Sequence, residues 1–214
     1  MPFLIISIPL KFQAVTAAHC VDFIKPHQVP YWLIKLGAHD HRQVEASTQT
    51  YNLKRIIIHP KYFLNADIAM VEFYGPAKLN SRVALPCLPK KGEYPAPGKK
   101  CVVAGWGYTK YPGGVYHTLQ QAELPVVKSP HKGCHNNKEA VCVGYGHGKM
   151  SDGKQYPNGC RGDSGGPLVC RRSDGRYQWE GVLSFVYSYC HSYTAYTPVN
   201  QYIDWIQSFI TSKN

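Results

Sequence analysis

Short runs of β-branched and aromatic residues recur along the whole chain, and residues that favour turns bound each run. Runs of this kind occupy residues 31–36, 51–58, 68–73, 100–104, 167–170 and 179–186. The segments between them are rich in Gly, Pro, Asn and Asp, as in 37–40 and 95–98. Strands of this length and spacing are typical of antiparallel barrels and sandwiches. The sequence therefore predicts an all-β fold.

Helical periodicity is clear only near the C-terminus. Val199, Ile203, Ile206 and Ile210 follow one another at steps of three or four residues, which is the spacing of one face of a helix. This pattern predicts an amphipathic C-terminal α-helix over residues 199–211.

A Pro- and Lys-rich segment, residues 86–100, divides the chain roughly in half. Such a composition is typical of a linker. We therefore expect one domain over residues 1–214 that contains two similar β units. The first is expected over about 12–85 and the second over 101–198.

The composition narrows the function classes. Of the 214 residues, 44% are apolar and 17% are charged, which excludes a disordered chain. No apolar run is long enough to cross a bilayer, so we expect no membrane span. Lys and Arg number 24 against 13 for Asp and Glu. The basic residues occur as scattered pairs and form no basic helix, so we expect no specific binding of nucleic acid.

Eight cysteines are spread along the chain, and none forms a Cys-x-x-Cys pair. This spacing argues against zinc and favours a disulfide framework in a secreted protein. Spacing alone leaves the pairing open. A calcium site is not expected either, because Asp40 and Glu45 are too few anchors in the loop 37–50.

The apolar segment 3–10 has two interpretations. It could be the apolar core of a short signal peptide, but no Lys or Arg precedes it and no clear cleavage site follows it. It could equally be a buried strand, and the sequence leaves the choice open.

The segment Cys160-Arg-Gly-Asp-Ser-Gly-Gly-Pro167 places one serine among three glycines. Glycines allow the tight turn in which backbone N–H groups converge near a hydroxyl, as an oxyanion hole requires. Two other interpretations apply to this segment: an ordinary Gly-rich turn, or an Arg-Gly-Asp adhesion tripeptide at 161–163.

A serine nucleophile needs a histidine base and a carboxylate that orients the base. Among the ten histidines, His19 stands out because small residues precede it and Cys20 follows it. Asp67 is the candidate acid because it directly precedes an apolar run and is expected to be buried with a partner. Taken singly, His19 is also explained as a packed histidine and Asp67 as a turn residue.

Five motifs occur in the order seen in chymotrypsin-like serine proteases, and the chain resembles this family from about Val15 to its C-terminal helix. The motifs are Thr16-Ala-Ala-His-Cys20, Asp67-Ile-Ala69, Gly105-Trp-Gly107, Gly162-Asp-Ser-Gly-Gly-Pro167 and Ser184-Phe-Val186. The resemblance implies two antiparallel β-barrels, with the active site between them, and a C-terminal α-helix. It also implies a serine-type endopeptidase that uses no cofactor and no metal.

The resemblance also implies a role for each matching residue. Ser164 is implied as the nucleophile, His19 as the general base and then acid, and Asp67 as the carboxylate that orients His19. The backbone N–H groups of Gly162 and Ser164 are implied as the oxyanion hole. The segment Ser184-Phe185-Val186 is implied as a strand that pairs with the substrate main chain.

The resemblance selects among the possible disulfides as well. The pairs that it implies are Cys101–Cys170, Cys134–Cys142 and Cys160–Cys190. Cys20 and Cys87 remain, and we expect both to be unpaired.

Substrate preference is implied by three positions. Asn158, six residues before Ser164, is implied at the base of the specificity pocket and carries no charge to receive Lys or Arg. Val186 and Thr194 are implied on the pocket walls, where their bulk narrows the pocket. The resemblance is therefore to elastase-type enzymes, which cut after small aliphatic residues.

The amino-terminal part departs from the family pattern. The family has an Ile-Val-Gly-Gly-type sequence and two strands before the histidine motif, whereas only eighteen residues precede His19. We therefore expect the first barrel to lack its first strands. In the family the freed amino group pairs with the aspartate before the nucleophile, here Asp163. Without that partner Asp163 is expected to be a buried charge costing roughly 3–5 kcal/mol, and the loop around Ser164 is expected to relax.

Two functions follow from these expectations. The first is a secreted, monomeric serine endopeptidase that acts on protein or peptide substrates and is a target for a serine protease inhibitor. The three candidate residues His19, Asp67 and Ser164 favour this function. The alternative is a catalytically silent, protease-like binding module, which the missing activation sequence favours.

Overall fold

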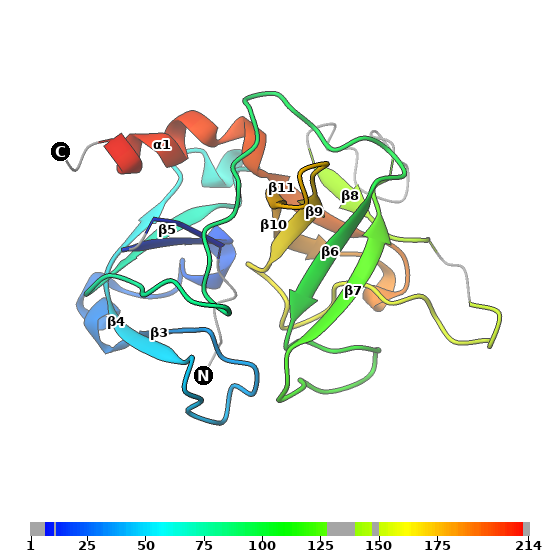
Figure 1. The fold of residues 1–214 in the computed structure, drawn as a ribbon, viewed down its shortest axis with the longest axis horizontal. Coiled ribbons are helices and arrows are strands. Elements are labelled where there is room, and N and C mark those ends of the chain that lie inside the picture. The colour runs from blue at the N-terminus through cyan, green and yellow to red at the C-terminus, as the bar shows by residue number, and fades with distance from the viewer. Residues whose placement is uncertain (1–6, 11, 128–139, 147–149, 212–214) are drawn as a thin grey trace.

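Two curled antiparallel β-sheets lie side by side in the computed structural model, and the C-terminal helix lies over the first of them (Figure 1). The structure describes residues 7–10, 12–127, 140–146 and 150–211. The prediction of an all-β fold made of two β units and one C-terminal helix is confirmed.

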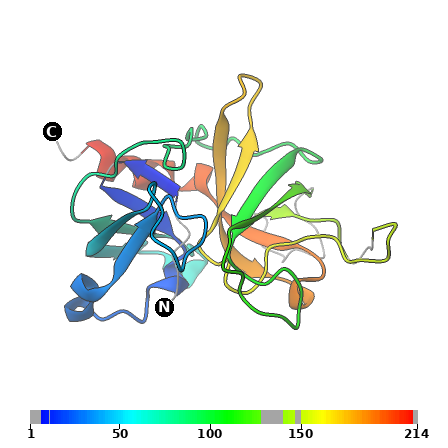
Figure 2. The ribbon, with the colours of Figure 1, turned by 60° about the horizontal axis from the view of Figure 1, so that its bottom comes forward.

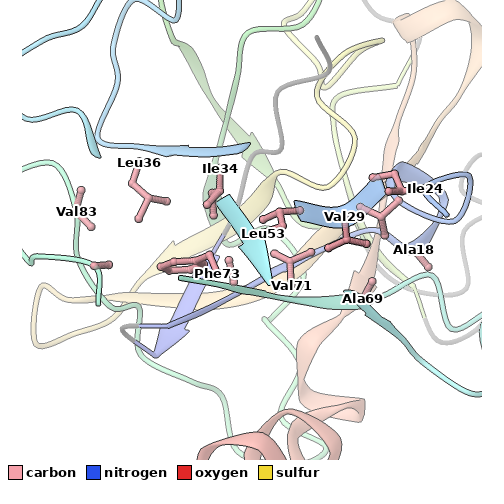
Figure 3. Close-up of a cluster of buried hydrophobic side chains, with 13 residues drawn as sticks. Ala18, Ile24, Val29, Ile34, Leu36, Leu53, Ala69, Val71, Phe73 and Val83 are labelled. Carbon is pink, nitrogen blue, oxygen red and sulfur yellow. The ribbon is translucent and has the colours of Figure 1, made fainter. Parts of the chain in front are cut away.

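The first sheet has five strands in the order β1-β2-β5-β4-β3. Their bounds are Ser7–Leu10 (β1), Gln13–Thr16 (β2), Leu33–Leu36 (β3), Gln49–Ile58 (β4) and Ala69–Phe73 (β5). The segment 3–10 thus contributes a strand, which is one of the two interpretations that the sequence left open. Figure 3 shows the apolar core of this sheet, in which Ile34, Leu53 and Phe73 are among the largest buried side chains.

The second sheet has six strands in the order β7-β6-β9-β10-β11-β8. Their bounds are Lys100–Gly105 (β6), Gln120–Pro125 (β7), Val141–Val143 (β8), Pro167–Arg171 (β9), Tyr177–Val186 (β10) and Thr194–Pro198 (β11). Leu124, Leu168, Leu183 and Tyr196 are buried at its centre. The β9–β10 hairpin projects from this half of the molecule (Figure 2).

The C-terminal helix α1 runs from Ile203 to Thr211. The expected start at Val199 is wrong, because Val199–Gln201 forms a separate 3₁₀ helix and Tyr202 follows it with a non-helical ψ of 12°. The other 3₁₀ helices are Ala18–Cys20, Pro26–Tyr31, Tyr62–Leu64 and Ser188–Cys190. No helix among the described residues is long and apolar enough to cross a membrane.

A third apolar cluster joins the two sheets to the C-terminal segment. It contains Val15, Ala17, Ile68 and Met70 from the first half, Trp179 and Val182 from the second, and Val199, Ile203 and Ile206. All nine side chains are buried. Because this cluster includes residues next to His19 and Asp67, apolar packing holds the first half of the candidate site against the second.

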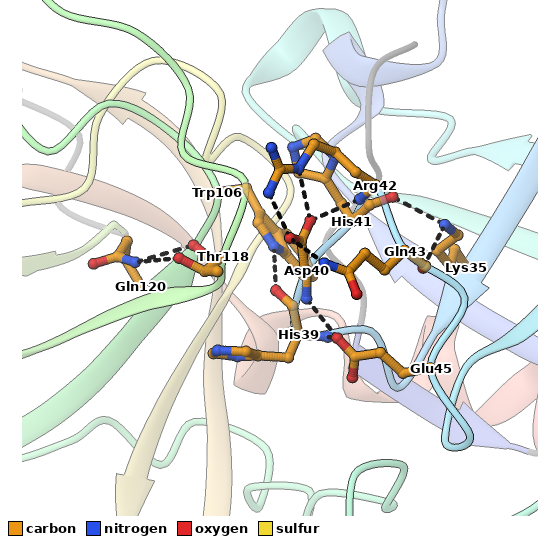
Figure 4. A network of polar contacts seen from close by, with 10 residues as sticks. All are labelled: Lys35, His39, Asp40, His41, Arg42, Gln43, Glu45, Trp106, Thr118 and Gln120. Carbon is orange, nitrogen blue, oxygen red and sulfur yellow. Dashed lines mark hydrogen bonds and ion pairs between the residues drawn. The ribbon is translucent and has the colours of Figure 1, made fainter.

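A polar network in the loop after β3 also reaches the second half (Figure 4). Trp106 Nε1–H donates to the His39 carbonyl over 3.0 Å, and the Leu119 N–H donates to the same carbonyl over 2.8 Å. The carboxylate of Asp40 pairs with Arg42, which lowers the pKa of Asp40 below its ordinary range. Glu45 pairs with Arg82. Both carboxylates that were considered as calcium ligands, Asp40 and Glu45, therefore form ion pairs with arginines of this protein.

Two of the three expected disulfides are formed between residues that the structure describes. Cys101–Cys170 joins opposed residues of β6 and β9, and Cys160–Cys190 closes the turn that carries Ser164 onto the loop after β10. The third expected pair involves Cys134, which lies outside the described residues. Cys20 and Cys87 are free cysteines, as expected.

Candidate active site

His19 and Asp67 meet because their strands pair. His19 lies three residues after the end of β2 and Asp67 two residues before the start of β5, and β2 pairs with β5 in a register that places Thr16 opposite Ala69. His19 donates its backbone N–H to Asp67 Oδ1 over 3.0 Å, and His19 Nδ1 lies 2.7 Å from Asp67 Oδ2. Two bonds to one carboxylate hold both the backbone and the ring of the histidine.

The second sheet also binds the carboxylate of Asp67. Ser184 Oγ, from β10, donates to Asp67 Oδ2 over 2.6 Å, and Thr197 Oγ1, from β11, donates to the Asp67 carbonyl over 3.0 Å. Burial by itself raises the pKa of Asp67, but the hydrogen bonds from His19 and Ser184 outweigh it and the pKa is lowered. Asp67 is therefore held as a carboxylate by groups from both halves of the molecule.

The ring of His19 has a partner on each side. Hydrogen bonds to Asp67 first, and to Cys20 second, raise the pKa of His19 from 6.5 to about 10 against the opposing effect of burial. The Cys20 Sγ lies 3.5 Å from His19 Nε2. The sequence placed Cys20 beside His19 but contained no signal that its thiol would face Nε2, because that depends on a side-chain rotamer.

Ser164 lies in a tight turn between Cys160 and β9. Gly162 and Gly165 flank it with φ angles of +93° and +80°, which side chains larger than hydrogen rarely adopt. The turn is tied to β10 by two backbone bonds, since the Gly165 N–H donates to the Leu183 carbonyl and the Leu183 N–H donates to the Gly166 carbonyl, each over 2.8 Å.

The same turn packs against the strand that leads to His19. A Cβ added to Gly165 would lie 2.2 Å from Thr16 Oγ1 and 3.3 Å from the Ala17 nitrogen. The chain next to Ser164 therefore touches residues two and three positions before His19, which brings all three predicted catalytic residues to one region. Within the described part of the chain, Ser164 Oγ itself makes no hydrogen bond.

The backbone donors of the turn fall into two groups. The N–H groups of Asp163, Gly165 and Gly166 donate to the carbonyls of Cys160, Leu183 and Asp163. The N–H groups of Gly162 and Ser164 donate to no acceptor among the described residues. Two neighbouring, unused donors beside a serine hydroxyl are the arrangement that stabilises a developing oxyanion.

Asp163 is buried directly behind the turn. Its side chain accepts the Gly107 N–H at Oδ1 over 2.8 Å and the Cys160 N–H at Oδ2 over 2.9 Å. Burial raises the pKa of Asp163 from 3.8 to about 6, although the two N–H bonds oppose the shift. The carboxyl is thus engaged with backbone donors that the sequence did not predict. The adhesion interpretation of residues 161–163 fails, because that function needs an exposed aspartate.

Asp163 is expected to make stability depend on pH. A carboxyl whose pKa is higher in the folded than in the unfolded chain stabilises the fold fully below the unfolded value of 3.8, and this contribution is lost as pH rises through about 6. The loss amounts to about 3 kcal/mol at about 1.4 kcal/mol per pKa unit. Urea unfolding at pH 4 and pH 7 measures it.

The control for this measurement is the Asp163→Asn variant, which has no titrating group at position 163. We expect the free energy of unfolding of the parent protein to fall by about 2 kcal/mol more than that of the variant between the two pH values, because the unfolded carboxyl is already partly ionised at pH 4. Glu180, whose pKa is raised by burial to about 7, titrates in both proteins and cancels in the comparison. An equal change in the free energy of unfolding for the two proteins would contradict the raised pKa of Asp163.

The structure brings together the three positions expected in the specificity pocket, Asn158, Val186 and Thr194. Thr194 is fully buried, and its Oγ1 donates to Asn158 Oδ1 over 2.7 Å. The Gly159 N–H donates to the same Oγ1 over 3.1 Å. Val186 lies in β10 opposite Thr194. The amide of Asn158 is therefore already held from within by Thr194, a contact that the sequence did not predict.

An open groove of about 800 Å³ runs from His19 along β10 and β11. It is lined by His19, Asp67 and Ser184, and its outer residues include Phe185 and Tyr62. Phe185 is 49% exposed. Sequence reasoning missed Tyr62, which comes from the 3₁₀ helix Tyr62–Leu64 and donates its hydroxyl to Asp22 over 2.9 Å.

The sequence pattern of the Trypsin family matches residues 8–206. Chymotrypsin-like elastase family member 1 of Homo sapiens is 37% identical over 213 residues, which cover 92% of this chain and 77% of the relative. The protein of the same name from Canis lupus familiaris is 36% identical over the same shares. Proproteinase E of Bos taurus is 35% identical over 215 residues, or 92% of this chain and 79% of the relative.

Proposed function

The chain belongs to the trypsin family of serine endopeptidases, and on this premise we propose that it hydrolyses peptide bonds through an acyl-enzyme formed on Ser164. The observation that carries the proposal is the pairing of His19 Nδ1 with Asp67 Oδ2 at 2.7 Å. In the neutral ring this bond places the proton on Nδ1 and leaves Nε2 as the acceptor, and the turn with Ser164 lies against Thr16, the last residue of β2.

In the proposed first step, Ser164 Oγ attacks the carbonyl carbon of the substrate while its proton passes to His19 Nε2. The carbonyl electrons move onto oxygen, and the unused N–H groups of Gly162 and Ser164 stabilise that charge. Collapse of the intermediate breaks the C–N bond, and the leaving amine takes the proton from His19. The product of this step is an ester on Ser164.

Water releases the acyl group by the same path in reverse. His19 takes a proton from water while the water oxygen bonds to the ester carbon. The bond between that carbon and Ser164 Oγ then breaks, and His19 returns the proton to Ser164 Oγ. Asp67 stabilises the protonated ring in both steps. Because Ser184 and Thr197 bind Asp67, we infer that the second sheet positions the carboxylate for this task.

Preference for small aliphatic residues before the scissile bond is proposed from the pocket positions. Asn158 is neutral and hydrogen-bonded to Thr194, so the pocket offers no carboxylate to a substrate Lys or Arg. Val186 and Thr194 add branched side chains to its walls. Two of the relatives reported above are named elastases, which agrees with this preference.

We also propose that the protein is secreted, acts as a monomer on protein substrates and is bound by a serine protease inhibitor. The two disulfides Cys101–Cys170 and Cys160–Cys190 support an oxidising compartment. The alternative function, a catalytically silent binding module, is favoured by the contact between Cys20 Sγ and His19 Nε2. The same experiment decides between the two functions.

The test uses a fluorophosphonate probe, which labels only an activated serine. We expect the full chain to be labelled and the Ser164→Ala variant to remain unlabelled, whereas the Ser173→Ala variant, altered at an exposed serine, retains labelling. Absence of labelling in the folded parent protein would establish the silent module instead. For preference, peptides that differ only before the scissile bond are compared, and faster cleavage after Arg than after Ala or Val would overturn the pocket assignment.

A further inference from the structure

We propose that Arg161 is a specificity-determining residue that selects peptides carrying a carboxylate side chain close to the scissile bond. Arg161 lies three residues before Ser164, in the turn that holds the unused N–H of Gly162. The inference deepens the proposed function and rests on it, because it concerns which substrates reach the same site.

Aromatic rings hold the side chain of Arg161 in place. Its guanidinium carbon, Cζ, lies 4.9 Å from the centre of the Tyr111 ring. The Tyr111 ring in turn stacks on Tyr189, with ring centres 5.0 Å apart and an interplanar angle of 24°. A guanidinium over an aromatic face is attracted by the ring and loses part of its rotational freedom.

Covalent and polar links bring these residues together from three segments. Arg161 and Tyr189 each neighbour a cysteine of the Cys160–Cys190 disulfide. Tyr111 belongs to the segment between β6 and β7, and its carbonyl lies 3.3 Å from His191 Nε2. The position of the guanidinium is thus set by the same disulfide that closes the turn around Ser164.

The charge of Arg161 is not neutralised by the protein. Its guanidinium forms no ion pair and no hydrogen bond with any residue that the structure describes, and the side chain is exposed. The nearest carboxyl along the chain, Asp163, is buried and occupied by the backbone N–H groups of Gly107 and Cys160. The donors of Arg161 therefore remain available to a ligand.

A carboxylate is the ligand that fits such a group. Arginine presents its N–H donors in a planar fork that matches the two oxygens of a carboxylate. Because Tyr111 already restricts the side chain of Arg161, less conformational entropy of this side chain is lost when a substrate binds. Asp or Glu side chains next to the scissile bond would thus be favoured, and Lys or Arg side chains there would be repelled.

Binding to the full-length Ser164→Ala protein tests the inference without requiring catalysis. Fluorescent peptides with an Ala-Ala scissile bond carry either Asp or its neutral isostere Asn at the second or third position on one side of the bond. We expect at least one Asp peptide to bind about three- to tenfold more tightly than its Asn counterpart in low salt, and this ratio to fall towards one in 0.5 M NaCl.

Further variants distinguish an effect of Arg161 from an effect of the general positive charge of the protein. Arg161→Gln in the Ser164→Ala background is expected to abolish the Asp preference, and Tyr111→Leu to reduce it. Arg171→Gln removes the same charge at the far end of β9 and is expected to retain the preference. Equal binding of Asp and Asn peptides at every position, or an equal loss with Arg171→Gln, would overturn the inference.

Cleavage by the protein with Ser164 intact distinguishes this inference from the proposed function. An Asp preference in binding without cleavage of any peptide would support Arg161 and contradict the protease. Cleavage of Asp and Asn peptides at equal kcat/KM would support the protease and contradict Arg161.

Discussion

The Asp67→Asn variant is expected to hydrolyse peptides about 10⁴-fold more slowly than the parent protein at neutral pH, the magnitude typical of Ser-His-Asp enzymes. Asp67 accepts both the backbone N–H and the ring N–H of His19. An amide at this position turns an N–H₂ group toward Nδ1, which forces the ring proton onto Nε2. A protonated Nε2 no longer removes the proton of Ser164, and measurement of kcat on an elastase-type peptide reports the loss.

Titration of the His19 ring identifies the cause of the decrease in kcat. Since hydrogen bonding to Asp67 is the largest contribution to the raised pKa of His19, removal of the carboxylate is expected to move the ring titration to lower pH, as followed by NMR of the ring protons. Asp22→Asn is the matched control, because Asp22 is a nearby carboxylate that binds Tyr62 and not His19. A decrease in kcat below tenfold in Asp67→Asn, or an equal decrease in Asp22→Asn, would contradict the assigned role.

The Gly165→Ala variant is expected to lose about 3 kcal/mol of stability toward urea unfolding. Gly165 has a φ of +80°, which costs an alanine about 1 kcal/mol. Its new methyl group would lie 2.2 Å from Thr16 Oγ1, so the turn or β2 must shift, and such overpacking adds about 2 kcal/mol. The shift moves Ser164 relative to His19, and we expect kcat/KM to fall about 10²-fold.

Two further variants distinguish the cost of the positive φ at Gly165 from the cost of the steric overlap with Thr16. Gly98 has a φ of +82°, and a Cβ added there meets no atom within 4 Å, so Gly98→Ala should lose only about 1 kcal/mol. Thr16→Ala removes the contacting oxygen, so Gly165→Ala should cost less in that background than in the parent protein. Equal losses of stability for Gly165→Ala and Gly98→Ala would show that the new methyl group at position 165 does not overlap with Thr16 of β2.

Much of the fold followed from local sequence patterns. The strands β4, β5, β6, β9 and β10 coincide closely with the apolar runs that predicted them. The strands β2, β7, β8 and β11 were missed, because they are short or carry polar residues. Gln13 in β2 is fully buried through a hydrogen bond to Glu72, and no periodic pattern predicts a buried amide whose partner lies 59 residues away along the chain.

The candidate site followed from motifs rather than from periodicity. His19, Asp67 and Ser164 were identified by ordered short segments, and the structure brings these segments to one region through the pairing of β2 with β5 and the packing of Gly165 on Thr16. The contact of Cys20 Sγ with His19 Nε2 was not predictable, because a side-chain rotamer depends on its surroundings.

The residue types along the chain specify the chemistry available to this protein: an all-β chain with a serine among glycines, a histidine, a carboxylate and the cysteines that close the turn. Local residue types decide these features. Three other features are visible only in the folded chain: the unused backbone donors of the turn, the burial of Asp163 behind it, and the contact of Arg161 with the Tyr111 ring. These features depend on contacts between segments far apart in the chain, and such contacts form only when the two sheets pack together.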